Sequence, residues 1–534
     1  MRRTILAVLG ALSLLLPAVS RSQVDTAWVR RYDGPGDYWD WARAIAVDGS
    51  GNVYVTGQSD GSGTSGDYAT IKYNSTGETL WVRRYNGPGN NTDNACAVAV
   101  DLSGNVYVAG SSYGGQPTNY DCATIKYSPN GDTLWVRRYS YPGNSQDVVE
   151  GLGLDGQGNV YVGGWTWSGG TSWRVLVVKY DSAGDFTWSQ TYASAYGAFC
   201  RAMAVDDSGS VYTTGEVQSS GSSDILTIKY NTDGIQQWVR TYNGPGNPYK
   251  EGDAIAIDDS GSVYVTGGSY PAGPDFDYET IKYSSAGVLK WAQIYSHNYD
   301  RPQAIAVDDS GNAYVTGGSY LLSGADYFDT EYATMKYDTA GVQEWLQRYN
   351  GPSDSGDMAC AIVLDEQNNV YITGTSRGLG TGDDFATVKY NTDGAEQWVA
   401  RYDGPDNGGD AAAAIAIDNQ GNIYVTGQSY GIGTNDDYVT IKYVQTPGIE
   451  EDRAPLSADR SSPEAGPTVV RGSLRLADGS GASSSPSWLL DAAGRKVADI
   501  HSGVNDIRAL SPGVYFLRLE GGADPATRKL VVQR

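Results

Sequence analysis

Short apolar segments alternate with polar turns along most of the chain, and their order repeats. Each repeat has a first apolar segment such as residues 44–48, a second such as residues 53–57, a third that ends in Lys-Tyr and a fourth that begins with Trp. Such short, nearly continuous apolar and β-branched runs are typical of strands that are covered on both faces. The turn Asp48-Gly-Ser-Gly-Asn52 places glycine where a tight hairpin needs a positive φ. The repeat therefore predicts four consecutive antiparallel strands.

The phase of the repeat indicates how the array ends. The Trp segment occurs eight times, starting at Trp28, and the Lys-Tyr segment occurs eight times, ending at Tyr443, with a period of 50 to 54 residues. The first Trp segment has no unit before it, and the last unit has no Trp segment after it. An open array gains nothing from this split, whereas in a closed ring the N-terminal strand completes the last sheet. We therefore predict an all-β protein whose residues 24–443 form an eight-bladed β-propeller closed by its N-terminal strand.

The two ends of the chain have a different composition. Residues 1–22 have two arginines followed by an apolar stretch and small residues, which predicts a signal peptide. Residues 444–468 are rich in Pro, Ser and acidic residues and are expected to be a linker. Short strand-like runs in residues 469–534 predict a small C-terminal β-sandwich. No other segment is apolar enough to cross a bilayer as a helix, so we expect an exported chain without a transmembrane helix once mature.

Charge and composition narrow the classes of function. The net charge is −24, and it belongs to the repeats, because residues 450–534 hold 11 basic and 11 acidic side chains. This excess of negative charge argues against nucleic acid as a partner. The four cysteines are scattered, so we expect free thiols. Only two histidines are present, His297 and His501, which excludes a His-based catalytic triad and a multi-His metal site.

Acidic residues recur six positions before the Lys-Tyr tyrosine in seven of the eight copies; the third copy has Arg174 there. This position begins the third strand on the side of the longer loops, so the carboxylates should form an acidic rim. One interpretation is that they cap loops or pair with neighbouring arginines. The other is that the rim binds cations, calcium among them, or basic partners. The acidic rim consists of Asp67, Asp121, Asp224, Asp277, Glu331, Asp384 and Asp437.

Other repeated residues are expected to be structural, because a single binding site needs asymmetry. Lys72 and Asp48 have equivalents in every copy, so we assign them to packing within the sheets. Aromatic residues outside the repeat pattern are more informative, and Trp165, Trp167 and Trp173 gather in the long loop of the third copy. Such side chains stack on sugars or anchor a protein partner, or they pack together as the core of a loop.

Two parts of the chain resemble known families. The segment AIAVDDSGNAYVTGGS…YATMKYDTAGVQEW, from Ala304 to Trp345, resembles the bacterial SBBP-type β-propeller repeat, which implies a propeller but no particular reaction. The segment LLDAAGRKVADI…LSPGVYFLRLEGG…TRKLVVQR is similar to the C-terminal sorting domain of the type IX secretion system, although the usual Asn-Pro near the start is absent. This resemblance implies the type IX machinery as a partner, passage through the periplasm, and a secreted or outer-surface location. The matching runs contain Gly494, Gly513, Tyr515 and Lys529.

Two functions remain open at this point, beside a structural role in a surface layer without any small ligand. The first is a binding or interaction scaffold for a surface protein or polysaccharide, exported through the C-terminal sorting domain. The second is a carbohydrate hydrolase or lyase that uses carboxylates at the propeller mouth, although no residue can be assigned as catalytic from the sequence. Two carboxyl groups close together in one place would favour the enzyme, whereas carboxylates spread evenly around a rim favour binding.

Overall fold

The computed structural model describes residues 23–446, except residues 37, 116–118, 144–145, 168–171, 246–248, 271–275, 298 and 321–329, and seven strands nearer the C-terminus. The chain divides into two compact units, Met1–Glu450 and Glu451–Arg534. The expected signal peptide and residues 447–467 of the expected linker lie outside the described residues. No described helix is long and apolar enough to cross a membrane.

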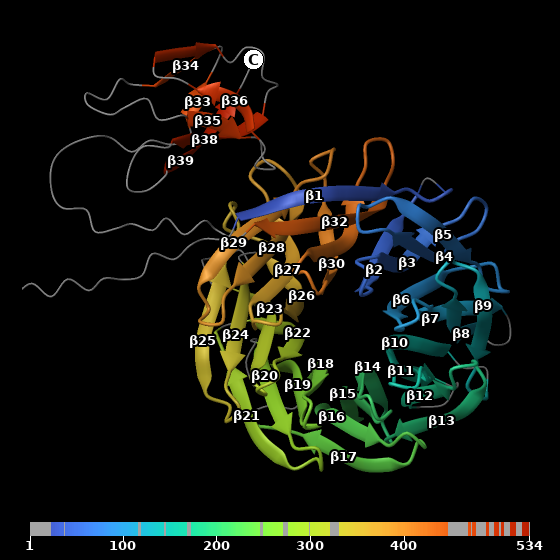
Figure 1. Cartoon of the computed structure of the whole chain (residues 1–534). Helices are drawn as coiled ribbons and strands as arrows, with labels where there is room; N and C mark the ends of the chain where they lie inside the picture. The colour runs from blue at the N-terminus through green and yellow to red at the C-terminus, as the bar shows by residue number, and fades with distance from the viewer. Residues whose placement is uncertain are drawn as a thin grey trace, which may run out of the picture. The chain divides into compact units, whose positions relative to one another are not determined.

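The first unit consists of antiparallel four-stranded sheets, which Figure 1 shows arranged around a central axis. Two groups of four, β14–β17 and β18–β21, count as one eight-stranded sheet because a single parallel bridge, Ser223 to Tyr249, joins them. The strands of the first four groups are β2 (Asp40–Val47), β3 (Val53–Asp60), β4 (Gly66–Tyr73), β5 (Thr79–Tyr85); β6 (Asp93–Val100), β7 (Val106–Gly115), β8 (Asn119–Tyr127), β9 (Thr133–Tyr139); β10 (Gln146–Leu154), β11 (Val160–Trp167), β12 (Arg174–Tyr180), β13 (Phe186–Ala193); β14 (Ala198–Val205), β15 (Val211–Ser219), β16 (Ser222–Tyr230) and β17 (Gln236–Tyr242).

The remaining groups follow the same order, except that the last is completed by the first strand of the chain. They are β18 (Tyr249–Ile257), β19 (Val263–Tyr270), β20 (Asp277–Tyr283), β21 (Leu289–Tyr295); β22 (Asp300–Val307), β23 (Ala313–Tyr320), β24 (Thr330–Tyr337), β25 (Gln343–Tyr349); β26 (Met358–Leu364), β27 (Val370–Arg377), β28 (Asp383–Tyr390), β29 (Glu396–Tyr402); and β30 (Asp410–Ile417), β31 (Ile423–Tyr430), β32 (Asp436–Thr446) with β1 (Gln23–Tyr32).

The pairing of β1 with β32 agrees with the phase of the repeat. The two strands run antiparallel, from Gln23 opposite Thr446 to Tyr32 opposite Tyr438. Trp28 of β1 is buried and packs on Tyr73 of the next sheet. Strand β32 continues past Tyr443 to Thr446, so the first three residues of the expected linker belong to this strand. The N-terminal segment therefore completes the last sheet, as the sequence predicted.

Residues that recur in every copy join each sheet to the next. Asp48 accepts hydrogen bonds from the backbone N–H of Asn52 at 2.9 Å and from the Tyr54 hydroxyl at 2.8 Å, and Gly51 in the same turn has a φ of +75°. Lys72 lies over the ring of Tyr54 and donates to the carbonyl of Pro129 in the neighbouring sheet. These contacts confirm that the Asp48-type and Lys72-type residues are structural. The four cysteines are free, as expected.

The first strand of each sheet carries a β-bulge, which matters for the site described below. In β2 the pairing with β3 shifts between Ala42 and Ala44, so Arg43 has no partner residue opposite it. The same shift occurs in β6, β10, β14, β18, β22, β26 and β30. These first strands are edge strands of their groups of four that lie toward the central axis in Figure 1, and each contacts the first strand of the next sheet. One bulged residue per sheet is therefore placed on the inner strand.

The second unit is also built of strands. A five-stranded sheet has the order β33-β39-β38-β35-β36, and β34 pairs with β37. Gly513 and Tyr515 lie on β38 and Lys529 lies on β39, which pairs with β38, whereas Gly494 is outside the described residues. The strands are β33 (Thr468–Val470), β34 (Ser473–Leu476), β35 (Ser487–Leu490), β36 (Lys496–Ile500), β37 (Gly503–Asp506), β38 (Gly513–Leu519) and β39 (Ala526–Val532).

Candidate functional site

Five of the seven residues of the acidic rim are paired with arginine. Asp67 accepts from the Nη2 of Arg84 at 2.9 Å, and the same guanidinium donates to the Ser59 carbonyl at 2.7 Å and to the Tyr32 hydroxyl at 3.1 Å. Because Tyr32 belongs to the last sheet, each arginine also ties two sheets together. The other pairs are Asp121 with Arg138 at 2.7 Å, Glu331 with Arg348 at 3.1 Å, Asp384 with Arg401 at 2.7 Å and Asp437 with Arg31 at 2.8 Å.

Asp224 and Asp277 lie in the two neighbouring sheets that lack this arginine. The equivalent positions hold Thr241 and Ile294. Burial raises the pKa of Asp224, and the charge of Lys250 opposes this shift. The rim is therefore not uniform. The fourth and fifth copies lack the arginine, and the third copy has Thr191 in place of the arginine and Arg174 in place of the acidic residue.

The same region has an ion pair inside the protein. Lys250 of β18 pairs with Glu279 of β20, and their side chains are 0% and 1% exposed. Six other copies have aspartate in place of Lys250, and no other copy has an acidic residue in place of Glu279. The two substitutions therefore compensate each other within one sheet.

A cluster of charged side chains lies on the inner strands β10, β14, β18 and β22 and on the adjoining strand β15, and we call it the inner charge cluster. Arg201 Nη2 lies 2.6 Å from Glu251 Oε2 and 3.8 Å from Glu216 Oε1. Arg301 Nη2 lies 3.9 Å from the other oxygen of Glu251. Arg201 and Arg301 are 38% and 43% exposed, so solvent reaches the cluster. The cluster comprises Glu150, Arg201, Glu216, Glu251, Asp253 and Arg301.

The carboxyl groups of this cluster have perturbed protonation. Burial, followed by the charge of Glu251, raises the pKa of Asp253 to about 7. The Oδ2 atom of Asp253 is buried and has no hydrogen-bond partner among the described residues. Burial also raises the pKa values of Glu216 and Glu150. The pKa of about 7 means that the Asp253 carboxyl exists in both its protonated and its ionised form at neutral pH.

Aromatic side chains adjoin the charged ones. The ring of Trp173 lies 5.0 Å from that of Trp165 and 5.3 Å from that of Phe199, and Trp167 lies 5.7 Å from Trp173. We call Trp165, Trp167, Trp173 and Phe199 the aromatic patch; all four are half-buried. Trp165 Nε1 donates to Glu150 Oε1 at 3.1 Å, which joins the patch to the inner charge cluster. Sugar rings and protein side chains both bind to such neighbouring apolar and polar groups.

The structure thus combines some of the expected residues and adds others. The three tryptophans expected from the sequence come together, although Trp165 and Trp167 lie on β11 and only Trp173 lies in the loop, because β11 extends to Trp167. The acidic rim does not contribute to this site. Sequence reasoning missed Phe199 and all six charged residues. Glu150, Arg201 and Asp253 occupy the bulged position in three consecutive copies, whereas the other copies have Arg43, Cys96, Gln303, Cys360 and Ala413 there. The signal was this change of residue type at one position of the repeat.

Cavities also lie elsewhere, and one of about 610 Å³ is lined by Lys336, Glu344, Trp345, Thr392 and Asp393. A second of about 590 Å³ is lined by the turn residues Asp206, Ser208, Asp258 and Ser260, and a third of about 360 Å³ is lined by the equivalent turns around Asp365 and Asp418. Because the second and third are formed by the same repeated turn, they are spaces between neighbouring sheets and show none of the asymmetry of the aromatic patch.

Comparisons with known proteins support the fold. Four segments, residues 28–63, 80–115, 134–170 and 290–320, match the SBBP beta-propeller repeat family. These segments are SBBP β-propeller repeats. No curated protein matches the chain in sequence.

Solved structures also resemble the chain. Sqt1 of Chaetomium thermophilum, solved bound to the N-terminus of the ribosomal protein L10, is 12% identical with a TM-score of 0.50, and the match covers 78% of this chain and 99% of Sqt1. The polysaccharide lyase Uly1 is 12% identical with a TM-score of 0.41, covering 68% of this chain and 92% of the lyase. The WD40 domain of SCAP from fission yeast is 9% identical with a TM-score of 0.41, covering 79% and 98%. At 12% identity the likeness to Sqt1 concerns the fold alone.

Proposed function

We propose that this protein is an exported, eight-bladed β-propeller that acts as a binding scaffold and holds a neutral polysaccharide at the aromatic patch and the inner charge cluster. The pairing of β1 with β32 supports ring closure, and the four-strand groups β14–β17 and β18–β21 then count as separate blades. Export through the C-terminal sorting domain to the outer surface rests on the resemblance of the tail and on the apolar N-terminal segment.

The observation that carries the binding proposal is the asymmetry of the site. Most aromatic residues of the repeat pack between sheets, whereas Trp165, Trp167 and Trp173 belong to one copy only. The patch they form with Phe199 is half-buried and lies beside hydrogen-bonding carboxylates and guanidinium groups. Sugar recognition uses this combination, because the ring faces stack on aromatic groups while the hydroxyls bond to charged side chains.

The charge balance of the site selects among polysaccharides. The inner charge cluster has four acidic and two basic side chains, so it carries a net negative charge when most carboxyls are ionised. The chain as a whole has a charge of −24. Polymers rich in uronate or sulfate would be repelled, whereas uncharged chains would not be. A protein partner is the alternative, and it would need a basic surface.

A glycan array with the full-length mature chain tests this proposal. We expect binding to uncharged glucans, mannans or xylans, and a loss of at least tenfold in affinity for Trp173→Ala. Trp39→Ala is the matched control, because Trp39 is an exposed tryptophan that stacks on Trp41 and lies outside the patch. A chain that binds no glycan, or a Trp173→Ala variant that binds as well as Trp39→Ala, would reject the polysaccharide proposal.

A second function, carbohydrate hydrolysis or cleavage by a lyase, is favoured by one observation. The pKa of Asp253 is raised to about 7 beside Glu251, and glycosidases use such a pairing of a protonated acid with a carboxylate. In this case Asp253→Asn abolishes the release of reducing ends or unsaturated products while binding persists. If the chain releases no product from any glycan that it binds, the enzyme is excluded and the binding scaffold is the function that fits.

A further inference from the structure

Buried aspartates begin the first strand of most sheets and accept a hydrogen bond from the preceding loop. Asp40 is 1% exposed, and its Oδ2 accepts from the backbone N–H of Gly34 at 2.6 Å. Asp410 is 0% exposed, and its Oδ2 accepts from the N–H of Gly404 at 2.5 Å. The second carboxylate oxygen, Oδ1 of Asp40 and of Asp410, is buried and has no hydrogen-bond partner among the described residues.

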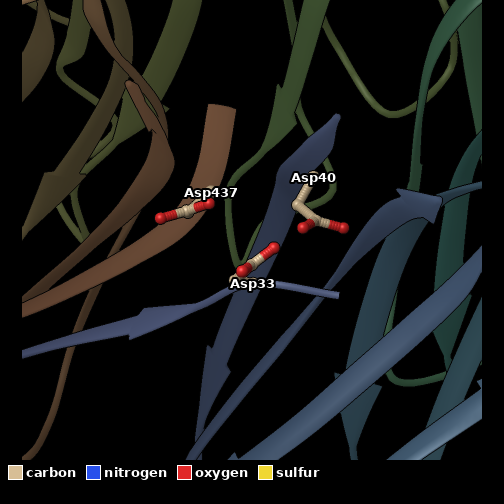
Figure 2. A group of neighbouring side chains, drawn as sticks. All are labelled: Asp33, Asp40 and Asp437. Atoms are coloured by element: carbon tan, nitrogen blue, oxygen red, sulfur yellow. The ribbon is translucent and has the colours of Figure 1, made fainter. Parts of the chain in front are cut away.

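Two of these buried aspartates, Asp40 and Asp410, each lie close to two other aspartates. One of the two belongs to the acidic rim and the other to a loop, and each group of three spans two sheets. The first triad is Asp33, Asp40 and Asp437, and one carboxylate oxygen of each lies within 4.8 Å of the others. Figure 2 shows that its members come from the loop after β1, from β2 and from β32. The second triad is Asp384, Asp403 and Asp410, and again one carboxylate oxygen of each lies within 4.8 Å of the others.

Each triad contains a buried oxygen without a partner. Asp437 is 5% exposed, and its Oδ2 holds Arg31 at 2.8 Å, but its Oδ1 has no hydrogen-bond partner among the described residues. Asp384 is 4% exposed; its Oδ2 holds Arg401 at 2.7 Å, and its Oδ1 likewise has no partner in the described part of the chain. A buried carboxylate oxygen without a donor is costly unless another group binds it.

The charge of each triad fits a divalent ion. Three carboxylates and one arginine leave two negative charges on each group, which a divalent cation neutralises. Asp33 and Asp403 are exposed, so water can complete the coordination from the solvent side. Two oxygens bound to one calcium ion at about 2.4 Å lie at most about 4.8 Å apart. The separations within each triad do not exceed this limit, so they are compatible with a shared ion.

We propose that the two triads are calcium sites, one between the last and the first sheet and one between the two sheets before that junction. Both sites join neighbouring sheets, and the first also joins residues that are distant in sequence, since Asp437 is on β32 and Asp40 is on β2. Calcium therefore stabilises the folded chain without taking part in ligand binding at the aromatic patch.

The chain itself offers a comparison. Equivalent loops have asparagine in place of Asp33 and Asp403: Asn86 precedes Gly87, and Asn350 precedes Gly351. There the amide closes the loop, since Asn86 Nδ2 donates to Asn90 Oδ1 at 2.7 Å. Asparagine is thus compatible with the fold at this position but leaves one carboxylate fewer, so Asp33→Asn and Asp403→Asn are conservative tests.

Calorimetric titration of the full-length mature chain with CaCl2, after treatment with EDTA, tests the proposal. We expect two sites with dissociation constants of roughly 0.1 to 1 mM, as in extracellular calcium modules. Calcium at about a hundred times the dissociation constant should raise the melting midpoint by about 5 °C, relative to NaCl of equal ionic strength.

Variants of the triads distinguish calcium binding at two defined sites from unspecific binding of cations to an acidic surface. Asp33→Asn and Asp403→Asn should each reduce the stoichiometry from two ions to one, and the double variant should bind none and lose the rise in melting midpoint. Asp406→Asn, an exposed neighbour outside the triad, should keep both sites. A wild-type chain without binding heat, or a double variant that binds calcium like the wild type, would overturn the proposal.

Discussion

The buried pair of Lys250 and Glu279 allows the sharpest test of the packing described above. Both side chains are excluded from water, with 0% and 1% exposure. Removing one partner leaves a buried charge without compensation, which costs about 3 to 5 kcal/mol. Replacing both by apolar groups of similar size removes the desolvation penalty as well, so it is neutral or stabilising by about 1 to 4 kcal/mol. We therefore expect Lys250→Met and Glu279→Leu to be strongly destabilising singly but not together.

The size of the expected change follows from the length of the first unit. For about 420 residues the unfolding entropy is roughly 0.9 kcal/mol per kelvin, so a loss of 4 kcal/mol lowers the melting midpoint by about 4 °C. Calorimetry at pH 7 measures the two single variants and the double variant as one cycle. Burial already raises the pKa of Glu279, and Lys250 opposes this shift. Without Lys250 the Glu279 carboxyl stays protonated to higher pH. The loss of unfolding free energy in Lys250→Met should therefore become smaller as the pH falls toward 4.5.

A half-exposed pair serves as the control. Lys336 and Glu344 are 11% and 44% exposed and 2.7 Å apart, so Lys336→Met should cost about 1 kcal/mol or less. If Lys250→Met costs no more than this control, or if the double variant is as unstable as the worse single variant, the account of the buried pair is wrong.

Three further predictions concern the ring, the site and the tail. Trp28→Ala should destabilise the chain by about 3 to 5 kcal/mol in thermal unfolding, as much as Trp81→Ala, because both rings are 7% exposed; a much smaller effect at Trp28 would contradict ring closure. Folding raises the pKa of Asp253 from its usual value near 4 to about 7. The protonated carboxyl therefore contributes stability that is fully present below about pH 4 and is lost as the pH rises through 7. Asp253→Asn should therefore be more stable than the wild type at pH 8 in urea unfolding but not at pH 4, and equal stability of the two at pH 8 would refute the shift. Deletion of residues 469–534 should leave a folded propeller that accumulates in the periplasm of a host with type IX secretion, and normal surface display would refute the sorting role.

The sequence by itself determined the strands, the turns and the order of the sheets. These depend on short-range patterns, such as Gly51 in its turn, and on the phase of the repeat, which placed Trp28 beside the last Lys-Tyr strand. The arginine pairs of the acidic rim were also within reach. Arg84 lies on the strand that pairs with the strand of Asp67, and the Trp strands of the third, fourth and fifth copies lack this arginine.

The tertiary structure decided where the asymmetric residues meet. Glu150, Arg201 and Asp253 look like scattered changes at a variable position of the repeat, because a β-bulge leaves no mark in the sequence of a single strand. Their contacts cross from one sheet to the next, so they depend on how the sheets pack around the axis. The same holds for Asp33 and Asp437, which are separated by most of the chain and meet only because β1 pairs with β32. Local patterns fix the strands, whereas sites built from several sheets exist only once the sheets are packed together.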